Sequence, residues 1–482
     1  MKKRNIYHDQ SQEIIGIFNS AKDKSKVMCV PMDYAKKDHV VMLCDGNGDI
    51  LRKPFAVKNS LKGKEYLTDI VIKSCQHRGI KREHVFFGGE HCGSFADNFI
   101  EALRSDNWIV AGVNAYDAKQ YRDNKQASTD SLDLLGICKM LLNFKGNCSP
   151  AQDGIYWNMR MLVRQRRKLV TIATSAKRRI HFLVDQIFPG FLDEKKSGIF
   201  PFSKGSLALM NDRFSVHQIR RRNRKTLSKF LARNLVQHAD LRAKQLQEYA
   251  SQVLEPSKDH IASLQLAVHQ QVKLLDCLQN SIQQLEKEIA QHLAQTSGAF
   301  LTSIRGIGIV LAAGICAEIG DPDKQKTLRE LVSYAGIIPR LKQTGGPQGK
   351  IQVKKVGKRC NRILKDYVVR SGHLIGIIGP EEFKLDYKRR NAQGQHTDFG
   401  MSRRYLRMAM CLMRTSQTYL PTKMRSSACT TEERSQYYLL SWPTFRQKWK
   451  RQDALEFAFD KNRPLGQWRN AVQRLYDIEL EI

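Results

Sequence analysis

The chain has 482 residues, which is enough for two or three domains with substantial cores. It carries 80 Lys and Arg residues against 47 Asp and Glu residues, a formal net charge of +33. Such an excess indicates a partner with dense negative charge, and nucleic acid fits better than an anionic membrane surface. The sequence has no apolar run of about 18 residues and begins without the apolar stretch of a secretion signal. We therefore expect a cytoplasmic protein.

The 11 cysteines are scattered singly and form no CxxC pair. This spacing gives no support to a zinc ribbon or zinc finger. An odd count without a secretion signal suggests free thiols in a reducing compartment.

The first 150 residues predict an α/β domain. Its first 25 residues are polar and are expected to be frayed or partly strand-like. Apolar runs and the turn sequence Asp45-Gly46-Asn47-Gly48 predict three strands, then a helix, a strand, a helix, a strand and a helix. In chain order these elements are expected at 27–33, 39–44, 50–57, 67–78, 85–90, 95–104, 108–113 and 129–142.

Four acidic residues stand at informative places in this order. Asp33 and Glu90 each follow a buried strand, and Asp130 and Asp133 lie three residues apart, on one face of the last helix. Neighbouring strand ends and a facing helix can bring four carboxylates within reach of the same metal ions. Mg²⁺ prefers such hard oxygen ligands, and two-metal phosphoryl chemistry needs several of them. The alternative for each acid alone is an ordinary solvated side chain.

Beyond residue 150 the sequence is helical and basic. We divide it into a basic helical region at 151–240, a coiled coil at 241–297, a compact helical domain at 298–415 and a C-terminal extension at 416–482. Residues 193–213 are rich in Gly, Pro and Ser and predict a loop. In the coiled-coil region apolar residues recur at intervals of three and four, which predicts a long antiparallel helical hairpin or coiled coil interrupted near Pro256. These residues are Val268, Val272, Leu275, Leu278, Ile282, Leu285 and Ile289.

Basic residues gather in runs that contain no acid, and we expect these runs to contact phosphates, although a solvated face is the alternative. The candidate contacts are Arg164, Arg167, Lys168, Arg178, Arg179, Arg220, Arg221, Arg222, Arg305, Lys350, Lys354, Lys355, Lys358, Arg359 and Arg362. Gly306 and Gly308 precede a predicted helix. They suit either a phosphate at the helix N-terminus or close helix packing.

Three segments of the first domain carry a resemblance to a known family: VPMDYAKKDHVVML, VFFGGEHCGSF and KQASTDSLDLLGIC. Over residues 25–145 the chain resembles the RuvC-like branch of the ribonuclease H fold, as found in insertion-sequence transposases that are guided by a bridge RNA. In that family an Asp-Glu-Asp-Asp set holds the metals. The resemblance implies that Asp33, Glu90, Asp130 and Asp133 hold two Mg²⁺ ions, with Mn²⁺ as an alternative.

Residues 298–415 are similar to a second part of the same transposases. There a loop after a proline carries a Ser-Gly pair whose serine is the recombination nucleophile. This sequence has Thr344 before Gly345 at the matching position. A β-branched secondary hydroxyl is a more hindered nucleophile, so we favour a turn role for Thr344.

A threonine at this position also fits the Tas nucleases of tandem-interspaced-guide-RNA systems, which the chain resembles in domain order. They combine a RuvC-like domain with a Nop-like RNA-binding region, and a coiled coil mediates dimerisation in Nop-type proteins. The expected fold is thus α/β plus mainly α: a RuvC-like domain, then a basic, coiled-coil-containing, Nop-like region.

Our leading hypothesis is an RNA-guided, Mg²⁺-dependent endonuclease that cleaves double-stranded DNA. Its expected partners are a guide RNA, target DNA and a second copy bound through the coiled coil, in a prokaryotic or phage-infected cell. The alternatives are a bridge-RNA-guided transposase or recombinase that uses Thr344, a non-catalytic RNA-binding scaffold, and a junction-resolving nuclease.

Overall fold

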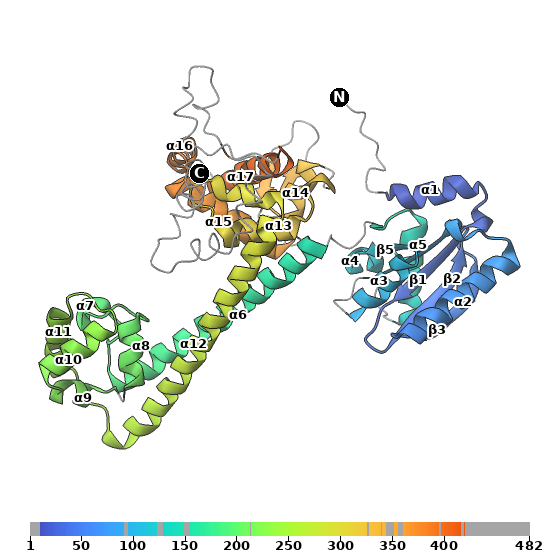
Figure 1. Ribbon diagram of the computed structural model, residues 1–482. Helices are drawn as coiled ribbons and strands as arrows, with labels where there is room; N and C mark the ends of the chain where they lie inside the picture. The colour runs from blue at the N-terminus through green and yellow to red at the C-terminus, as the bar shows by residue number, and fades with distance from the viewer. Residues whose placement is uncertain are drawn as a thin grey trace, which may run out of the picture. The chain divides into compact units, whose positions relative to one another are not determined.

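A computed structural model describes residues 10–90, 95–122, 129–148, 154–212, 214–324, 327–338, 340–343, 351–354, 360–394, 397–415 and 419. The chain divides into two compact units, Met1–Ala151 and Gln152–Ile482. Figure 1 shows an α/β unit and a mainly helical unit, each of which is described separately below. Among the described residues, no helix is both long and apolar enough to cross a membrane.

The N-terminal unit is built on a five-stranded mixed sheet. Its strands are β1 (Met28–Asp33), β2 (Asp38–Asp45), β3 (Ile50–Lys58), β4 (Val85–Glu90) and β5 (Ile109–Val113), in the spatial order β3-β2-β1-β4-β5. The first three strands form an antiparallel meander, whereas β1, β4 and β5 run parallel. All five predicted strands are confirmed to within a residue or two. Parallel pairing of β1 with β4 brings their carboxyl ends to the same edge.

Helices cover both faces of this sheet. On one face α1 (Gln12–Ala21) and α5 (Asp130–Leu142) bury apolar side chains such as Ile14 and Leu141 against Phe86. On the other face α2 (Leu61–Arg78) and α3 (Asp97–Ser105) pack around Phe87. The shorter helices of the unit are η1 (Lys24–Lys26), η2 (Arg82–His84) and α4 (Ala115–Gln120).

The expectation of a frayed or strand-like segment is wrong for residues 12–21, which form α1, while residues 1–9 lie outside the described residues. Ser11 caps this helix by accepting a hydrogen bond from the Ile14 amide, and Ile14 and Ile17 lie on its buried face. Their spacing of three is a helical signal that the polar residues around them obscured.

The second unit is organised around two long antiparallel helices, α6 (Gly154–Ile187) and α12 (Lys258–Ala294), which lie side by side in Figure 1. The start of α6 shares a core with the end of α12, and the end of α6 shares another core with the middle of α12. At that far end sits a small helical cap, formed by α7 (Glu194–Ser197), α8 (Lys204–Asn211), α9 (Val216–Arg221), α10 (Arg224–Arg233) and α11 (Ala239–Gln252). Because α7 and α8 lie within 193–213, the loop predicted there is wrong.

The heptad pattern is confirmed, since all seven of its apolar residues are buried or partly buried in these cores. Their partner, however, is α6 of the same chain. The coiled-coil seam is therefore covered within one chain, and a homodimer would have to use another face of α12.

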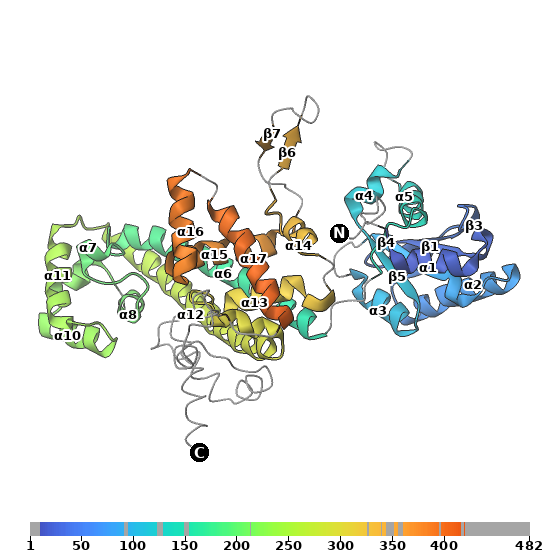
Figure 2. The same ribbon diagram turned by 90° about the horizontal axis from the view of Figure 1, so that it is seen from above.

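The opposite end of the α6–α12 pair carries a larger helical core. It consists of η4 (Ser297–Ser303), α13 (Ile309–Ile319), η5 (Pro322–Lys324), α14 (Leu328–Tyr334), α15 (Arg362–Ile378), α16 (Glu381–Ala392) and α17 (Thr397–Thr415). A two-stranded hairpin, β6 (Arg340–Gln343) and β7 (Ile351–Lys354), leaves this core between α14 and α15. It projects away from the helices in Figure 2.

Candidate functional site

Two of the predicted acids end neighbouring strands. Met32 of β1 is paired with Gly89 of β4, so Asp33 and Glu90 are the next residues along parallel strands. Glycine is required at position 89, because a Cβ there would collide with the Met32 carbonyl oxygen and the Tyr34 ring. The close approach of the two backbones thus depends on a residue without a side chain.

The other two acids lie in the first turn of α5. Thr129 caps this helix, and its hydroxyl oxygen accepts a hydrogen bond from the Leu132 amide. The helix is held on the sheet by Leu141, whose side chain passes so close to Gly88 that a Cβ there would lie 2.6 Å from it. This contact sets the helix against the strand that ends in Glu90.

The charge effects on Asp33 indicate that the other three acids lie near it. Burial, and then the charges of Asp133, Asp130 and Glu90, raise the pKa of Asp33 from 3.8 to about 6. Since Coulomb interactions in a partly solvated protein decay over several ångströms, all three carboxylates lie near Asp33. The sequence pattern had indicated this convergence.

Sequence reasoning missed a fifth charged residue at this place, Arg122. Its side chain is buried, with 8 % of the residue exposed, and its guanidinium forms an ion pair with Asp133. The positive charge also lowers the pKa of Asp33, against the effect of the acids. Gly136 of α5 makes room for this arginine, because a Cβ there would lie 3.0 Å from Arg122 Cγ. No feature of the local sequence distinguishes Arg122 from the many other basic residues.

The donor set fits a hard divalent cation. In addition to burial, repulsion from Asp133, Asp130 and Glu90 raises the pKa of Asp33, and the Arg122 guanidinium opposes this effect. A divalent cation would offset that repulsion with oxygen ligands of the kind that Mg²⁺ prefers. As their side chains stand, the described residues contain no group of three or more His, Cys, Asp or Glu arranged to hold a metal ion. The carboxylates would therefore have to close around the ion when it binds.

The predicted basic contacts divide into three groups. Exposed positions in the second unit are occupied by Lys168, Arg178, Arg179, Arg221, Arg305 and Arg362. Ion pairs within the unit engage Arg164 with Glu318, Arg167 with Asp366, Arg220 with Glu255, and Arg222 with Asp212. Lys350, Lys355, Lys358 and Arg359 lie outside the described residues, as does Thr344, and Lys354 is described only through the backbone of β7. The exposed group is the one best placed to meet a nucleic acid.

The two glycines before α13 have different surroundings. Gly306 has a φ of 95°, and a Cβ there would lie 3.1 Å from Ile378 Cγ1, so both its backbone conformation and its packing favour glycine. Gly308 is the N-cap of α13 and has open space around its Cα. Packing accounts for the first glycine, and phosphate contact at the second stays a prediction.

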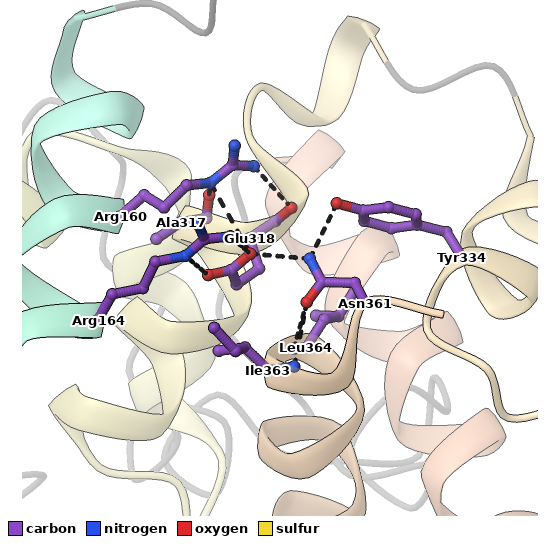
Figure 3. A network of polar contacts seen from close by, with 8 residues as sticks. All are labelled: Arg160, Arg164, Ala317, Glu318, Tyr334, Asn361, Ile363 and Leu364. Carbon is purple, nitrogen blue, oxygen red and sulfur yellow. Dashed lines mark hydrogen bonds and ion pairs between the residues drawn. The ribbon is translucent and has the colours of Figure 1, made fainter. Parts of the chain in front are cut away.

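A buried ionic network lies in the second unit, where α6, α13 and α15 meet (Figure 3). Glu318 is 1 % exposed, and both of its carboxylate oxygens accept hydrogen bonds from Arg164, at 2.8 and 2.9 Å. Arg160 donates to the backbone carbonyls of Ala317 and Glu318 at the end of α13. These contacts overcome the effect of burial and lower the pKa of Glu318, which therefore stays ionised.

Two family models match the chain. One, described as a transposase with the DEDD domain of IS110 elements, matches residues 30–189, and the other, described as the transposase IS116/IS110/IS902 family, matches residues 298–369. The first contains all four acids, and the second contains Thr344 and the β6–β7 hairpin.

Curated relatives agree with these matches. The chain is 24% identical over 404 residues to an uncharacterized 44.8 kDa protein of insertion element IS116 from Streptomyces clavuligerus, an alignment that covers 81% of this chain and 96% of that protein. It is 26% identical over 102 residues to a probable family 20 transposase of Pseudomonas aeruginosa, covering 21% of this chain and 29% of the relative. It is 32% identical over 85 residues to the transposase of insertion element IS1328 from Yersinia enterocolitica, covering 17% and 25%.

The mixed sheet and the four acids thus lie in a segment that is similar to the DEDD domain of transposases, a similarity that implies phosphodiester chemistry as the class of activity. More particularly, the chain is related to the transposases of IS110 and IS116 elements. Its five-stranded sheet is consistent with the RuvC-like fold of such domains.

Proposed function

We propose that this protein is a DNA transposase or recombinase that cuts phosphodiester bonds at a two-metal site formed by Asp33, Glu90, Asp130 and Asp133. The observation that carries the proposal is the parallel register that places Asp33 and Glu90 at neighbouring strand ends, with Asp130 and Asp133 on the first turn of α5; their charges act on Asp33 in addition to burial. These acids lie in the segment that matches the transposase DEDD domain. The relationship to transposases at both ends of the chain favours rejoining of DNA over cleavage alone.

The four acids of the site are positioned by different elements of the fold. Asp33 and Glu90 are fixed by the register of two parallel strands, whereas Asp130 and Asp133 sit on the first turn of a packed helix. Bound Mg²⁺ ions would activate the attacking oxygen and stabilise the leaving oxygen. Arg122 holds Asp133, and its charge would also attract the scissile phosphate.

Rejoining requires a second nucleophile, and we assign Thr344 to this role by its resemblance to the recombination serine. Its hydroxyl oxygen would attack the DNA phosphorus and release the deoxyribose hydroxyl, with its proton passing to a base. The hydroxyl of another DNA end would then attack this phosphothreonine, reform a phosphodiester and free Thr344. The pairing of Gln343 with Ile351 makes residues 344–350 the connection between β6 and β7.

A second candidate function is RNA-guided DNA cleavage without rejoining, as in the Tas nucleases. Threonine in place of serine is the observation that favours it, because a β-branched hydroxyl is a hindered nucleophile. In this function the metal site cuts DNA and Thr344 has only a turn role.

For both functions we propose a guide RNA as the partner that supplies sequence specificity, in the cytoplasm of a prokaryotic or phage-infected cell. The net charge of +33 and the exposed basic residues of the second unit support binding to a phosphate backbone. Sequencing the RNA that co-purifies with the protein tests this partner. Random fragments of host RNA, without a recurrent sequence, would contradict it.

The two functions are separated by paired substitutions in the full chain. With its co-purified RNA, Mg²⁺ and matched DNA, Asp33→Ala should abolish cutting, whereas Asp69→Ala, an exposed acid of α2, should not. Thr344→Ala should abolish strand joining and the covalent protein–DNA adduct that denaturing gels detect. Intact cutting by Thr344→Ala, without an adduct in the wild type, would favour the nuclease. Undiminished cutting by Asp33→Ala would overturn both functions.

A further inference from the structure

The helices on either side of the β6–β7 hairpin are joined by hydrogen bonds where α14 ends and α15 begins. The Asn361 amide donates to the Tyr334 carbonyl oxygen at 2.9 Å, and Asn361 Nδ2 donates to the Tyr334 hydroxyl oxygen at 2.8 Å. Tyr334 is the last residue of α14, before the hairpin, and Asn361 directly precedes α15, after it. Gly336 packs so tightly against Cys360 that a Cβ would collide with that side chain. The chain therefore leaves and re-enters the helical core at one point.

The same asparagine joins this base to the buried ionic network. Its Nδ2 also donates to Glu318 Oε2 at 2.8 Å, while its Oδ1 accepts from the amides of Ile363 and Leu364 and so caps α15. Glu318 in turn accepts hydrogen bonds from Nε and Nη2 of Arg164, which lies in α6. Figure 3 shows this continuous line of contacts from Arg164 through Glu318 and Asn361 to Tyr334.

Burial distinguishes this network from the other ion pairs of α6. Arg166 pairs with Glu286 at 2.7 Å and Arg167 pairs with Asp366, and both acids are about a quarter exposed or less. The side chain of Glu318 is fully buried. A buried ion pair adds little net stability compared with apolar packing. We therefore explain the fully hydrogen-bonded carboxylate of Glu318 by its effect on the relative positions of the segments that it joins.

We propose that Arg164, Glu318, Asn361 and Tyr334, which we call the hairpin clamp, position the β6–β7 hairpin relative to α6. The clamp holds together the chain segments that precede and follow the hairpin strands. This inference rests on the proposed function, since the candidate nucleophile, Thr344, directly follows β6 in the sequence. Glu318 is a positioning residue, because it acts through Asn361 and touches neither DNA nor metal.

Amide hydrogen exchange of the full chain tests the clamp without reference to activity. In Glu318→Gln we expect exchange at 340–343 and 351–354 to accelerate by about tenfold or more, because a charged hydrogen bond restrains local opening. Exchange within α12 should stay within about twofold of the wild type. Glu286→Gln is the matched control, since it removes an ion pair of the same helix α6 without touching the hairpin base.

Two milder variants keep the test decisive if Glu318→Gln does not fold. Asn361→Ser retains an N-cap oxygen for α15 but removes the amide donor to Glu318. Tyr334→Phe removes only the hydroxyl that Asn361 contacts. Both should accelerate exchange in the hairpin strands, with little change in the melting temperature.

Hairpin exchange that equals the wild type in the folded variants would overturn the proposal, and so would an equal rise throughout the second unit. The failure of the proposed function is seen separately. If Asp33→Ala and Thr344→Ala leave DNA cutting and joining intact while the clamp variants loosen the hairpin, then the clamp exists and the proposed chemistry is wrong.

Discussion

Replacing Asp33 with Asn should stabilise the metal-free protein at neutral pH. Burial and three carboxylates raise the pKa of Asp33 from 3.8 to about 6. Between these values the folded chain holds a proton that the unfolded chain has lost, so the free energy of unfolding decreases as the pH rises through this window. At ~1.4 kcal/mol per pH unit the full penalty is about 3 kcal/mol. Solvent screening of a partly exposed side chain reduces it to about 1–2 kcal/mol.

The assay is thermal unfolding of the full chain in EDTA at pH 4 and pH 8. At pH 8 the Asp33→Asn variant should melt several degrees above the wild type, since ~1 kcal/mol corresponds to about 2–4 °C for a unit of this size. The difference should shrink towards pH 4, where the wild-type carboxyl is protonated. Adding Mg²⁺ at pH 8 should raise the melting temperature of the wild type more than that of the variant.

Asp69→Asn provides the control, because this exposed acid of α2 pairs only with the exposed Lys73 at 3.6 Å among the ion pairs seen here. It should change the melting temperature by less than about 1 °C at either pH. The reasoning is refuted if Asp33→Asn gives no gain at pH 8 in EDTA, or if its gain is the same at pH 4.

Three further predictions concern packing and charge. Gly89→Ala should lower the melting temperature of the first unit and abolish DNA cutting, because its Cβ would push β1 away from β4 beside Asp33. Gly16→Ala, which has open space around it, is the control for both the melting temperature and the cutting assay. Arg122→Met should lower the melting temperature in EDTA by leaving the acids without a counter-charge, and Mg²⁺ should restore more of it than in the wild type; an unchanged Mg²⁺ response would contradict this role. Leu275→Ala, at a fully buried site, should cost about 2–5 kcal/mol in denaturant unfolding, and Leu274→Ala, 43% exposed, far less.

The positions of the four acids in the fold could be predicted because two regular signals coincided. Asp33 and Glu90 follow apolar strands, and the spacing of Asp130 and Asp133 places them on one helical face, so local patterns were sufficient. Arg122 could not be predicted in the same way. Its contact with Asp133 depends on how α4 packs against α5, which no local periodicity encodes.

The sequence also did not predict which segment packs against the apolar face of α12. The heptad pattern of α12 correctly predicted a helix with an apolar seam, but a seam does not specify whether its partner is another copy or another segment. The partner is α6, whose buried residues such as Ile180 and Leu183 alternate with basic residues that dominated the interpretation of its sequence. Likewise, the ion pair of Arg164 with the buried Glu318 could not be predicted, because Glu318 is 154 residues away in the chain.

Helix α6 also connects the two regions of the chain that match transposase families. The DEDD family match runs through α6 to residue 189, yet this helix packs with α12 and α13 in the second unit. Its Arg164 binds Glu318, which lies inside the second matched region, 298–369. Through Arg164 and Glu318, the first half of α6 is thereby connected to Asn361 and Tyr334 at the base of the hairpin.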